Sequence, residues 1–246
     1  MYSLICALAA GTAMFLAIGL PWKPSYAALP AVAVMAGTYY LLARRNSKAV
    51  EALMLKMQTE LQQNRSDNAI RILEQGYSHC RWVFLLRSQI DGQIGTIHFM
   101  NRRFEDALPL LEKAWVKHWI AKGMLGVYWF RKHKPEKAFE ILDHAIAANK
   151  KEGMLYGIKA FMKVRLKDRD GARDVLIAAT KKLPQSEPIA GSLIRLQNGQ
   201  DLRMWEFGDV WWNFHLQKPS EKRLMKMAGG ASKIGAKGAK KSMYKG

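Results

Sequence analysis

The chain has 246 residues, enough for one or two domains with a buried core. Its 39 Lys and Arg outnumber its 20 Asp and Glu, and the formal charge of +19 predicts an acidic neighbour such as nucleic acid, an anionic lipid surface or an acidic protein. The two cysteines, Cys6 and Cys80, exclude a disulfide framework and favour a reducing compartment.

Two uncharged apolar runs, residues 2–20 and 26–43, open the chain on either side of the short segment PWKPS. A helix needs about 20 such residues to cross the hydrocarbon core of a bilayer, so each run is long enough to span it. Small residues recur every four positions in both runs, which would let two membrane helices approach closely. The pattern predicts a transmembrane hairpin over residues 1–45.

Three cations, Arg44, Arg45 and Lys48, directly follow the second run, whereas the connecting loop has only Lys23. Positive residues accumulate on the cytoplasmic side of membrane helices, so these predicted membrane-surface residues place the rest of the chain in the cytoplasm. We therefore expect an integral membrane protein of the bacterial inner membrane. Two alternatives stay open: the first run could be a cleaved signal peptide, or both runs could be buried helices of a soluble domain.

From residue 48 onward the apolar residues recur with helical spacing, and no sustained alternation indicates strands. The half-helix FEDALPLLEKAW at Phe104 is repeated as PEKAFEILDHAI at Pro135; a further copy begins at Arg169 and a weaker one at Ser66. In each copy a shared alanine follows a small residue of the preceding helix, except that Met57 breaks the pattern in the weaker copy. The residues predicted to pack the repeats are Gly95, Ala107, Gly126, Ala138, Ala160 and Ala172.

This spacing, together with Leu111, Leu142, Leu176 and Pro184, resembles the tetratricopeptide repeat (TPR), a helix-turn-helix unit of about 34 residues. The resemblance covers about residues 50 to 184, although two copies lack the closing proline and Pro109 lies inside a second helix. It implies an α-solenoid of antiparallel helix pairs over residues 46–200. No single pair could bury its apolar face alone, so several must stack.

In the TPR family the first helix of each pair lines the concave side, so the resemblance implies a groove that binds partner proteins. The inward positions combine aromatic residues with arginines, which suits a peptide or helix that carries apolar anchors and some acidic residues. Some of the phenylalanines could instead pack between neighbouring helices. The predicted groove residues are Gln89, Thr96, Phe99, Met100, Val127, Phe130, Arg131, Phe161 and Arg165.

Three glycines, Gly92, Gly123 and Gly157, occupy inward positions of the first helices. Chaperone-binding members of the family carry there the polar cluster that holds a C-terminal carboxylate. A receptor for chaperone tails is therefore disfavoured.

After the repeats, the stretch SEPIAGSLIRLQNGQ predicts a capping helix. A Trp-rich segment follows over residues 201–217, and its Trp205, Trp211 and Trp212 could cover the last apolar face, anchor a partner or lie at lipid headgroups. We favour the structural cover because aromatic residues mostly serve burial. Residues 218–246, rich in Lys and Gly, predict a disordered basic tail.

Motifs for catalysis or metal binding do not stand out in this sequence. The six histidines form no His-x-x-x-His pair, the cysteines no Cys-x-x-Cys pair, and no Ser or Cys lies in a nucleophile elbow. We therefore expect no enzyme activity, no catalytic or metal-ligating residue and no cofactor.

The expected protein is all-α: a transmembrane hairpin, a TPR-like repeat domain, a Trp-rich segment and a basic tail. Its expected function is that of a membrane-anchored scaffold or adaptor that binds partner proteins in the groove, contacts anionic lipid and supports assembly of a membrane-associated complex. The alternative is a membrane protein that binds nucleic acid or ribosomes through the basic tail.

Overall fold

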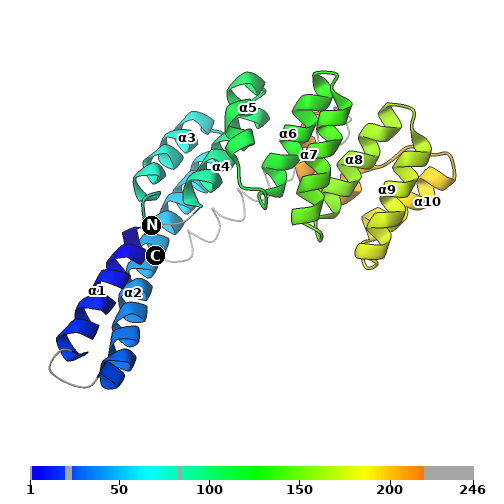
Figure 1. Ribbon diagram of the computed structural model, residues 1–246. Coiled ribbons are helices and arrows are strands. Elements are labelled where there is room, and N and C mark those ends of the chain that lie inside the picture. The colour runs from blue at the N-terminus through cyan, green and yellow to red at the C-terminus, as the bar shows by residue number, and fades with distance from the viewer. Residues whose placement is uncertain (1, 20–23, 83–84, 219–246) are drawn as a thin grey trace, which may run out of the picture.

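The computed structural model describes residues 2–19, 24–82 and 85–218, and every regular element among them is helical (Figure 1). This agrees with the predicted all-α class. Two helices, α1 (Tyr2–Gly19) and α2 (Pro24–Gln62), form a hairpin that projects from one end of a row of helix pairs. The predicted basic tail lies outside the described residues, apart from its first residue.

The structure does not support the predicted membrane span of the hairpin. Among the described residues, no helix combines the length and the apolar run that a membrane span needs. The predicted transmembrane hairpin over residues 1–45 is therefore wrong, and so is the predicted localisation as an integral membrane protein. Helix α1 has 18 residues, which at 1.5 Å each give about 27 Å, less than the ~30 Å hydrocarbon core. The second apolar run is only one part of the 39-residue helix α2.

Three predicted membrane-surface residues, Arg44, Arg45 and Lys48, lie exposed in the middle of α2. The helix passes through the predicted domain boundary at residue 45 without interruption, and its last turns pack against α3 (Ser66–Gln75). Because the described residues contain no membrane span for these cations to flank, the prediction that they mark a membrane surface loses its basis.

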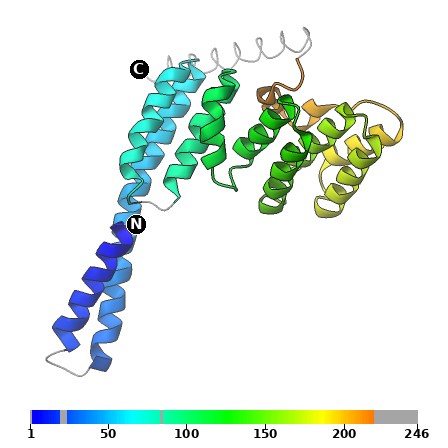
Figure 2. The same ribbon diagram turned by 45° about the horizontal axis from the view of Figure 1, so that its top comes forward.

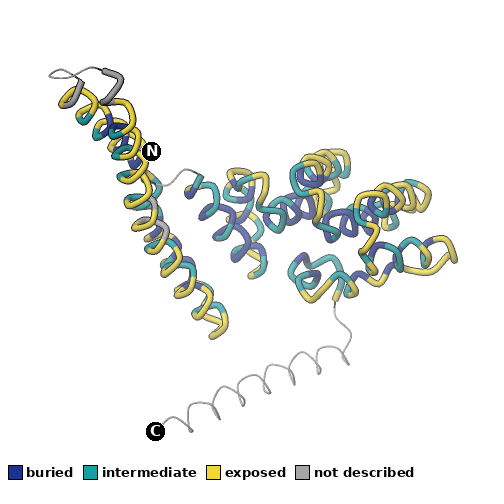
Figure 3. Tube along the Cα trace, turned by 90° about the horizontal axis from the view of Figure 1, so that it is seen from below, coloured by how far each residue is buried: buried dark blue, intermediate teal, exposed yellow. Residues whose placement is uncertain are grey.

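Small residues pack the two helices of the hairpin together. Ala7 and Ala31 are buried, and a Cβ at Gly11 would lie 3.0 Å from the Cβ of Met35. The outer faces of both helices are largely exposed (Figure 3). The hairpin is tied to the rest of the chain at the first turn of α1, where the amide of Tyr2 donates to the carbonyl of Arg81 at 2.9 Å.

Beyond the hairpin, successive helices form antiparallel pairs that stack side by side (Figures 1 and 2). The end of α2 pairs with α3, and α10 (Glu187–Gln197) packs on the last pair and closes the row. The described residues thus form a bundle of adjacent helix pairs that is compatible with a helical-repeat solenoid. The complete pairs are α4 (Leu86–Met100) with α5 (Phe104–Lys113), α6 (Trp119–Arg131) with α7 (Pro135–Ala148), and α8 (Gly153–Arg165) with α9 (Arg169–Lys182).

The same turn connects the two helices of each pair. Its apex is a residue with left-handed backbone, and φ is 58° at Asn64, 62° at Arg102, 57° at His133 and 65° at Lys167. The amide of the following residue donates to the carbonyl five residues earlier at 2.9–3.0 Å, which is the Schellman arrangement at a helix C-terminus. Gly199, with φ of 71°, repeats this turn after α10. Helix α10 therefore takes the place of the first helix of a further pair.

The residues predicted to pack the repeats lie where the two helices of a pair meet. Ala107, Ala138, Ala160 and Ala172 are fully buried. A Cβ at Gly126 would lie 2.9 Å from Cγ of Leu142, and one at Gly95 would lie 3.1 Å from Cβ of Leu110. At these two points the helices approach so closely that a side chain would displace its neighbour.

A buried polar contact, which the sequence did not reveal, joins α4 to the 3-10 helix η1 (Gly76–His79). The hydroxyl of Tyr77 donates to Oδ1 of Asp91 at 2.5 Å, and Asp91 is only 5% exposed. Burial raises the pKa of Tyr77, and the hydrogen bond to Asp91 raises this pKa further, so the tyrosine keeps its proton. The contact fixes the end of the first pair against the second pair.

Candidate functional site

A C-terminal segment of the chain lies along the first helices α4, α6 and α8. This groove segment, residues 202–217, contains two short 3-10 helices, η2 (Met204–Phe207) and η3 (Asp209–Phe214). Helix η2 contacts α8, and η3 contacts α6 and α4 (Figure 2, orange). The segment therefore runs back along the side of the row that was predicted to bind a partner.

Large side chains anchor the groove segment. Trp211 and Phe214 are fully buried, and the ring of Trp211 packs edge-on against Phe161 with the centroids 5.0 Å apart. The ring of His215 stacks on Phe99, and its Nε2 lies 3.0 Å from the carbonyl oxygen of Met100. The tryptophans were predicted to cover the last apolar face of the repeats. Instead α10 packs on the last pair, and Trp211 packs in the groove.

Two glycines make room for these anchors. A Cβ at Gly123 of α6 would lie 3.0 Å from Cε1 of Phe214. A Cβ at Gly157, at the equivalent position of α8, would lie 2.9 Å from Cε of Met204 and 3.0 Å from Cζ of Phe207. From the sequence, these glycines indicated only that a carboxylate clamp is absent. Their positions admit large side chains of the groove segment.

Five of the nine predicted groove residues lie under helix contacts or under the groove segment. Phe99 and Val127 are fully buried, and Thr96 is 7% exposed and donates its hydroxyl to the carbonyl of Gly92 at 2.8 Å. Gln89 and Met100 are half-buried. The predicted groove is therefore filled in part by the same chain, because His215 packs on Phe99 of α4 and Phe214 lies against Gly123 of α6.

The other four predicted residues meet at one pocket. A cavity of about 600 Å³ lies between the C-terminal ends of α6 and α8 and the end of the groove segment. This volume is within the range of small-ligand and side-chain pockets. The groove segment adds His215 and Leu216 to the lining, which the sequence did not predict. The lining residues are Phe130, Arg131, His133, Pro135, Phe161, Arg165, Leu166, His215 and Leu216.

Two guanidinium groups face the pocket from neighbouring repeats. Cζ of Arg165 lies 5.1 Å from the ring centroid of Phe161, and Cζ of Arg131 lies 4.5 Å from that of Phe104. Arg131 also donates from Nη1 to the carbonyl of His215 at 3.3 Å. Neither arginine forms an ion pair with any residue that the structure describes. The pocket therefore offers two uncompensated positive charges beside apolar walls.

Burial governs the ionisation of His215. Burial lowers its pKa below the ordinary 6.5, and the charges of Arg102 and Arg131 lower the pKa further, against an opposing effect of the Met100 carbonyl. The ring is therefore mainly neutral at pH 7 while it lies against Phe99.

Acidification is expected to loosen the groove segment. When the segment is released, His215 regains a pKa near 6.5, so the released state binds more protons and docking weakens as the pH falls through that value. Amide hydrogen exchange of residues 204–214, followed from pH 7.5 to pH 5, measures this effect. His215→Gln should flatten the profile, whereas the exposed His144→Gln should leave it unchanged. A His215→Gln profile as steep as that of the wild type would contradict the assignment.

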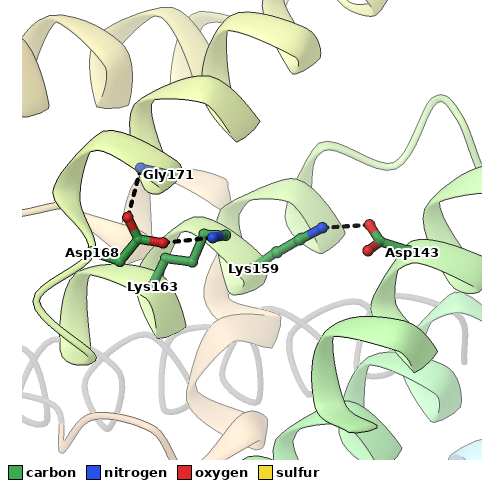
Figure 4. Close-up of polar contacts among 5 residues, drawn as sticks. All are labelled: Asp143, Lys159, Lys163, Asp168 and Gly171. Atoms are coloured by element: carbon green, nitrogen blue, oxygen red, sulfur yellow. Dashed lines mark hydrogen bonds and ion pairs between the residues drawn. The ribbon is translucent and has the colours of Figure 1, made fainter. Parts of the chain in front are cut away.

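Ion pairs outside the pocket join neighbouring helices (Figure 4). Lys159 of α8 contacts Oδ1 of Asp143 in α7 at 2.5 Å. Asp168 accepts from Lys163 at 2.6 Å and from the amide of Gly171 at 2.8 Å, which caps α9. The hydrogen bond from Lys163 is the main reason that the pKa of Asp168 is lowered. These carboxylates are 58% and 45% exposed, so the pairs are surface contacts rather than a second site.

Metal chemistry finds no support in the described part of the chain. Within residues 2–19, 24–82 and 85–218, no three His, Cys, Asp or Glu side chains are grouped so as to hold a metal ion. Cys6 and Cys80 are free thiols, and burial raises the pKa of Cys80, which keeps that thiol protonated.

Comparisons of this chain with protein-family models, curated proteins and solved structures find no match. The role of the pocket is therefore argued from its own geometry and chemistry.

Proposed function

We propose that the protein is a TPR-like adaptor that binds a segment of a partner protein in the pocket between α6, α8 and the groove segment. The observation that carries the proposal is the meeting of Arg131 and Arg165 with the apolar side chains of Phe130 and Leu166 in one cavity. A guanidinium binds a carboxylate through charge-assisted hydrogen bonds, and apolar walls bury a neighbouring side chain. The partner segment thus carries an acidic residue beside a large apolar one.

The stacked helix pairs, the recurrent turn and the small residues at equivalent positions support the TPR-like part of the proposal. Stacked helical repeats characteristically present an extended concave surface to a partner. The formal charge of +19 adds long-range attraction for an acidic partner and speeds encounter with it.

A peptide is favoured over nucleic acid as the occupant of this pocket. Stacking of bases needs free aromatic faces. Two phenylalanines line the pocket, and the ring of one of them, Phe161, already contacts Arg165 and Trp211. The predicted nucleic-acid role of the basic tail concerns residues that are almost all outside the described ranges, and it stays a prediction.

Binding to a defined peptide library tests the proposal. Peptides with Asp or Glu beside Phe, Trp or Leu are compared with the same peptides carrying Asn or Gln. We expect the acidic peptides to bind the full chain, and to bind the double variant Arg131→Gln/Arg165→Gln about 100-fold more weakly. Each charged hydrogen bond contributes about 1.5–3 kcal/mol, and 1.4 kcal/mol is a factor of ten in affinity.

The control is Lys181→Gln/Lys182→Gln, which removes the same charge from the exposed end of α9. It should change affinity only slightly. Equal binding of the acidic and amide peptides, or an equal loss in the control, would refute the proposed role of the two arginines.

A further inference from the structure

The groove segment occupies the place of a bound partner. After the Gly199 turn, the chain does not form the second helix of another pair. Met204 lies five residues past the apex, where Ala107, Ala138 and Ala172 lie in the complete pairs. It is fully buried, but against Gly157 of α8 instead of within a new pair. The repeat pattern therefore ends after α10, and the chain runs back along the first helices.

The contacts of the segment follow a regular spacing. Met204, Phe207, Trp211 and Phe214 are separated by three, four and three residues and all pack on the first helices or on one another. Met204 and Phe207 lie on η2, and Trp211 and Phe214 lie on η3; within each 3-10 helix, residues three apart share one face, and Gly208 with φ of 116° separates the two helices. The groove therefore fits a short amphipathic segment with large apolar anchors.

The groove segment supplies no carboxylate to the two arginines of the pocket. Its last residues, Asn213 to Gln217, contain no acid. Arg131 donates to the carbonyl of His215 at 3.3 Å and forms no ion pair within the described residues. Leu216 lines the pocket beside both arginines. A carboxylate near this point would form charge-assisted hydrogen bonds that the chain's own segment lacks, and these are about twice as strong as neutral ones.

We infer that residues 202–217 occupy the partner-binding site of their own chain, and that a partner segment binds by displacing them. The partner is an amphipathic segment with large apolar residues at the spacing of Met204, Phe207, Trp211 and Phe214, followed by an acidic residue that reaches Arg131 and Arg165. This inference rests on the proposed function and goes beyond it, because it names the pattern of the partner and the occupant that competes with it.

The test uses the full chain with a specific protease site inserted between Gln200 and Asp201, which are both exposed. Cleavage keeps every residue but removes the tether, which otherwise holds the segment at an effective concentration in the millimolar range. Two labelled peptides of residues 201–218 are added, one with the native sequence and one with Leu216→Glu. We expect both to exchange into the cut chain, the Leu216→Glu peptide at about tenfold lower concentration, and the uncut chain to need at least 100-fold more of either.

Variants of the cut chain locate the binding surface. Gly157→Ala places a Cβ against Met204 and Phe207 and should weaken both peptides. Gly191→Ala is the matched control, because its Cβ would meet only Oε2 of Glu206 at 3.6 Å. Arg131→Gln should weaken the native peptide modestly, because it loses the hydrogen bond to the His215 carbonyl. It should weaken the Leu216→Glu peptide more, so that most of the advantage of that peptide disappears.

The outcomes separate this inference from the proposed function. If the repeats lose amide protection once the segment leaves, or if the native peptide does not rebind, the segment is part of the fold and the inference fails. Binding of the acidic library to the pocket would then still stand. If the native peptide exchanges but neither the library nor the Leu216→Glu peptide gains from its acid, the acidic partner fails in both proposals while exchange stands.

Discussion

Trp211→Ala is expected to release the groove segment from α6 and α8 while the helix pairs stay folded. The side chain is fully buried and packs edge-on against Phe161 at 5.0 Å. Removal of a large buried aromatic destabilises its surroundings by about 3–5 kcal/mol, a large share of the 5–15 kcal/mol that holds a native protein. We expect protection of residues 204–214 against amide exchange to fall about 100-fold or more, because 1.4 kcal/mol is a factor of ten.

Ile194→Ala serves as the control for this loss. Ile194 is 57% exposed on α10, so truncation there should change protection of the groove segment little. Protection within α4 to α9 should persist in both variants. A parallel loss of protection in those helices in the Trp211→Ala protein would mean that segment and repeats unfold as one cooperative unit.

Ala138→Leu is expected to lower the free energy of unfolding by about 2 kcal/mol or more. Ala138 is fully buried at the contact between α6 and α7, and its carbonyl oxygen lies only 3.5 Å from where a Cβ of Gly126 would be. The three additional carbons of leucine have no space there, so the two helices must separate. Urea denaturation, followed by far-UV circular dichroism, measures the change.

Ala147→Leu tests whether the effect belongs to the site and not to the substitution. Ala147 lies exposed on the same helix, so its replacement should change stability by no more than about 0.5 kcal/mol. An unchanged denaturation midpoint in Ala138→Leu would mean that the alanine does not set the spacing of the pair.

The error about the hairpin has a simple physical origin. An uncharged run of apolar residues does not by itself show where its helix ends or which elements the helix meets. The second run continues as one helix through Arg44 and Arg45 to Gln62, and Ser3 near the start of the first donates its hydroxyl to the carbonyl of Trp82. These features depend on how the elements meet.

The contacts in the groove could not be predicted from local sequence either. Gly123, Gly157 and the Trp-rich segment are all visible in the sequence, but nothing local connects them. The contact of His215 with Arg131 spans 84 residues, and its contact with Met100 spans 115. Two sequence features could have suggested this contact: a glycine that recurs at the same inward position of neighbouring repeats, and a Trp-rich segment with no partner in the repeat pattern. The aromatic side chains fill the space that the glycines leave.

The sequence by itself determined the helical class and the frame of the repeated pairs. Both depend on spacings within about 34 residues, such as Gly126 before Ala138, and helical periodicity expresses such spacings directly. Only the tertiary structure decided what covers the groove and that Phe130, Arg131, Phe161 and Arg165 meet at a pocket. The reason is that residues 202–217 fold back over helices that lie far earlier in the chain, up to 115 positions away. The packing of large side chains against distant glycines leaves no periodic trace in the sequence.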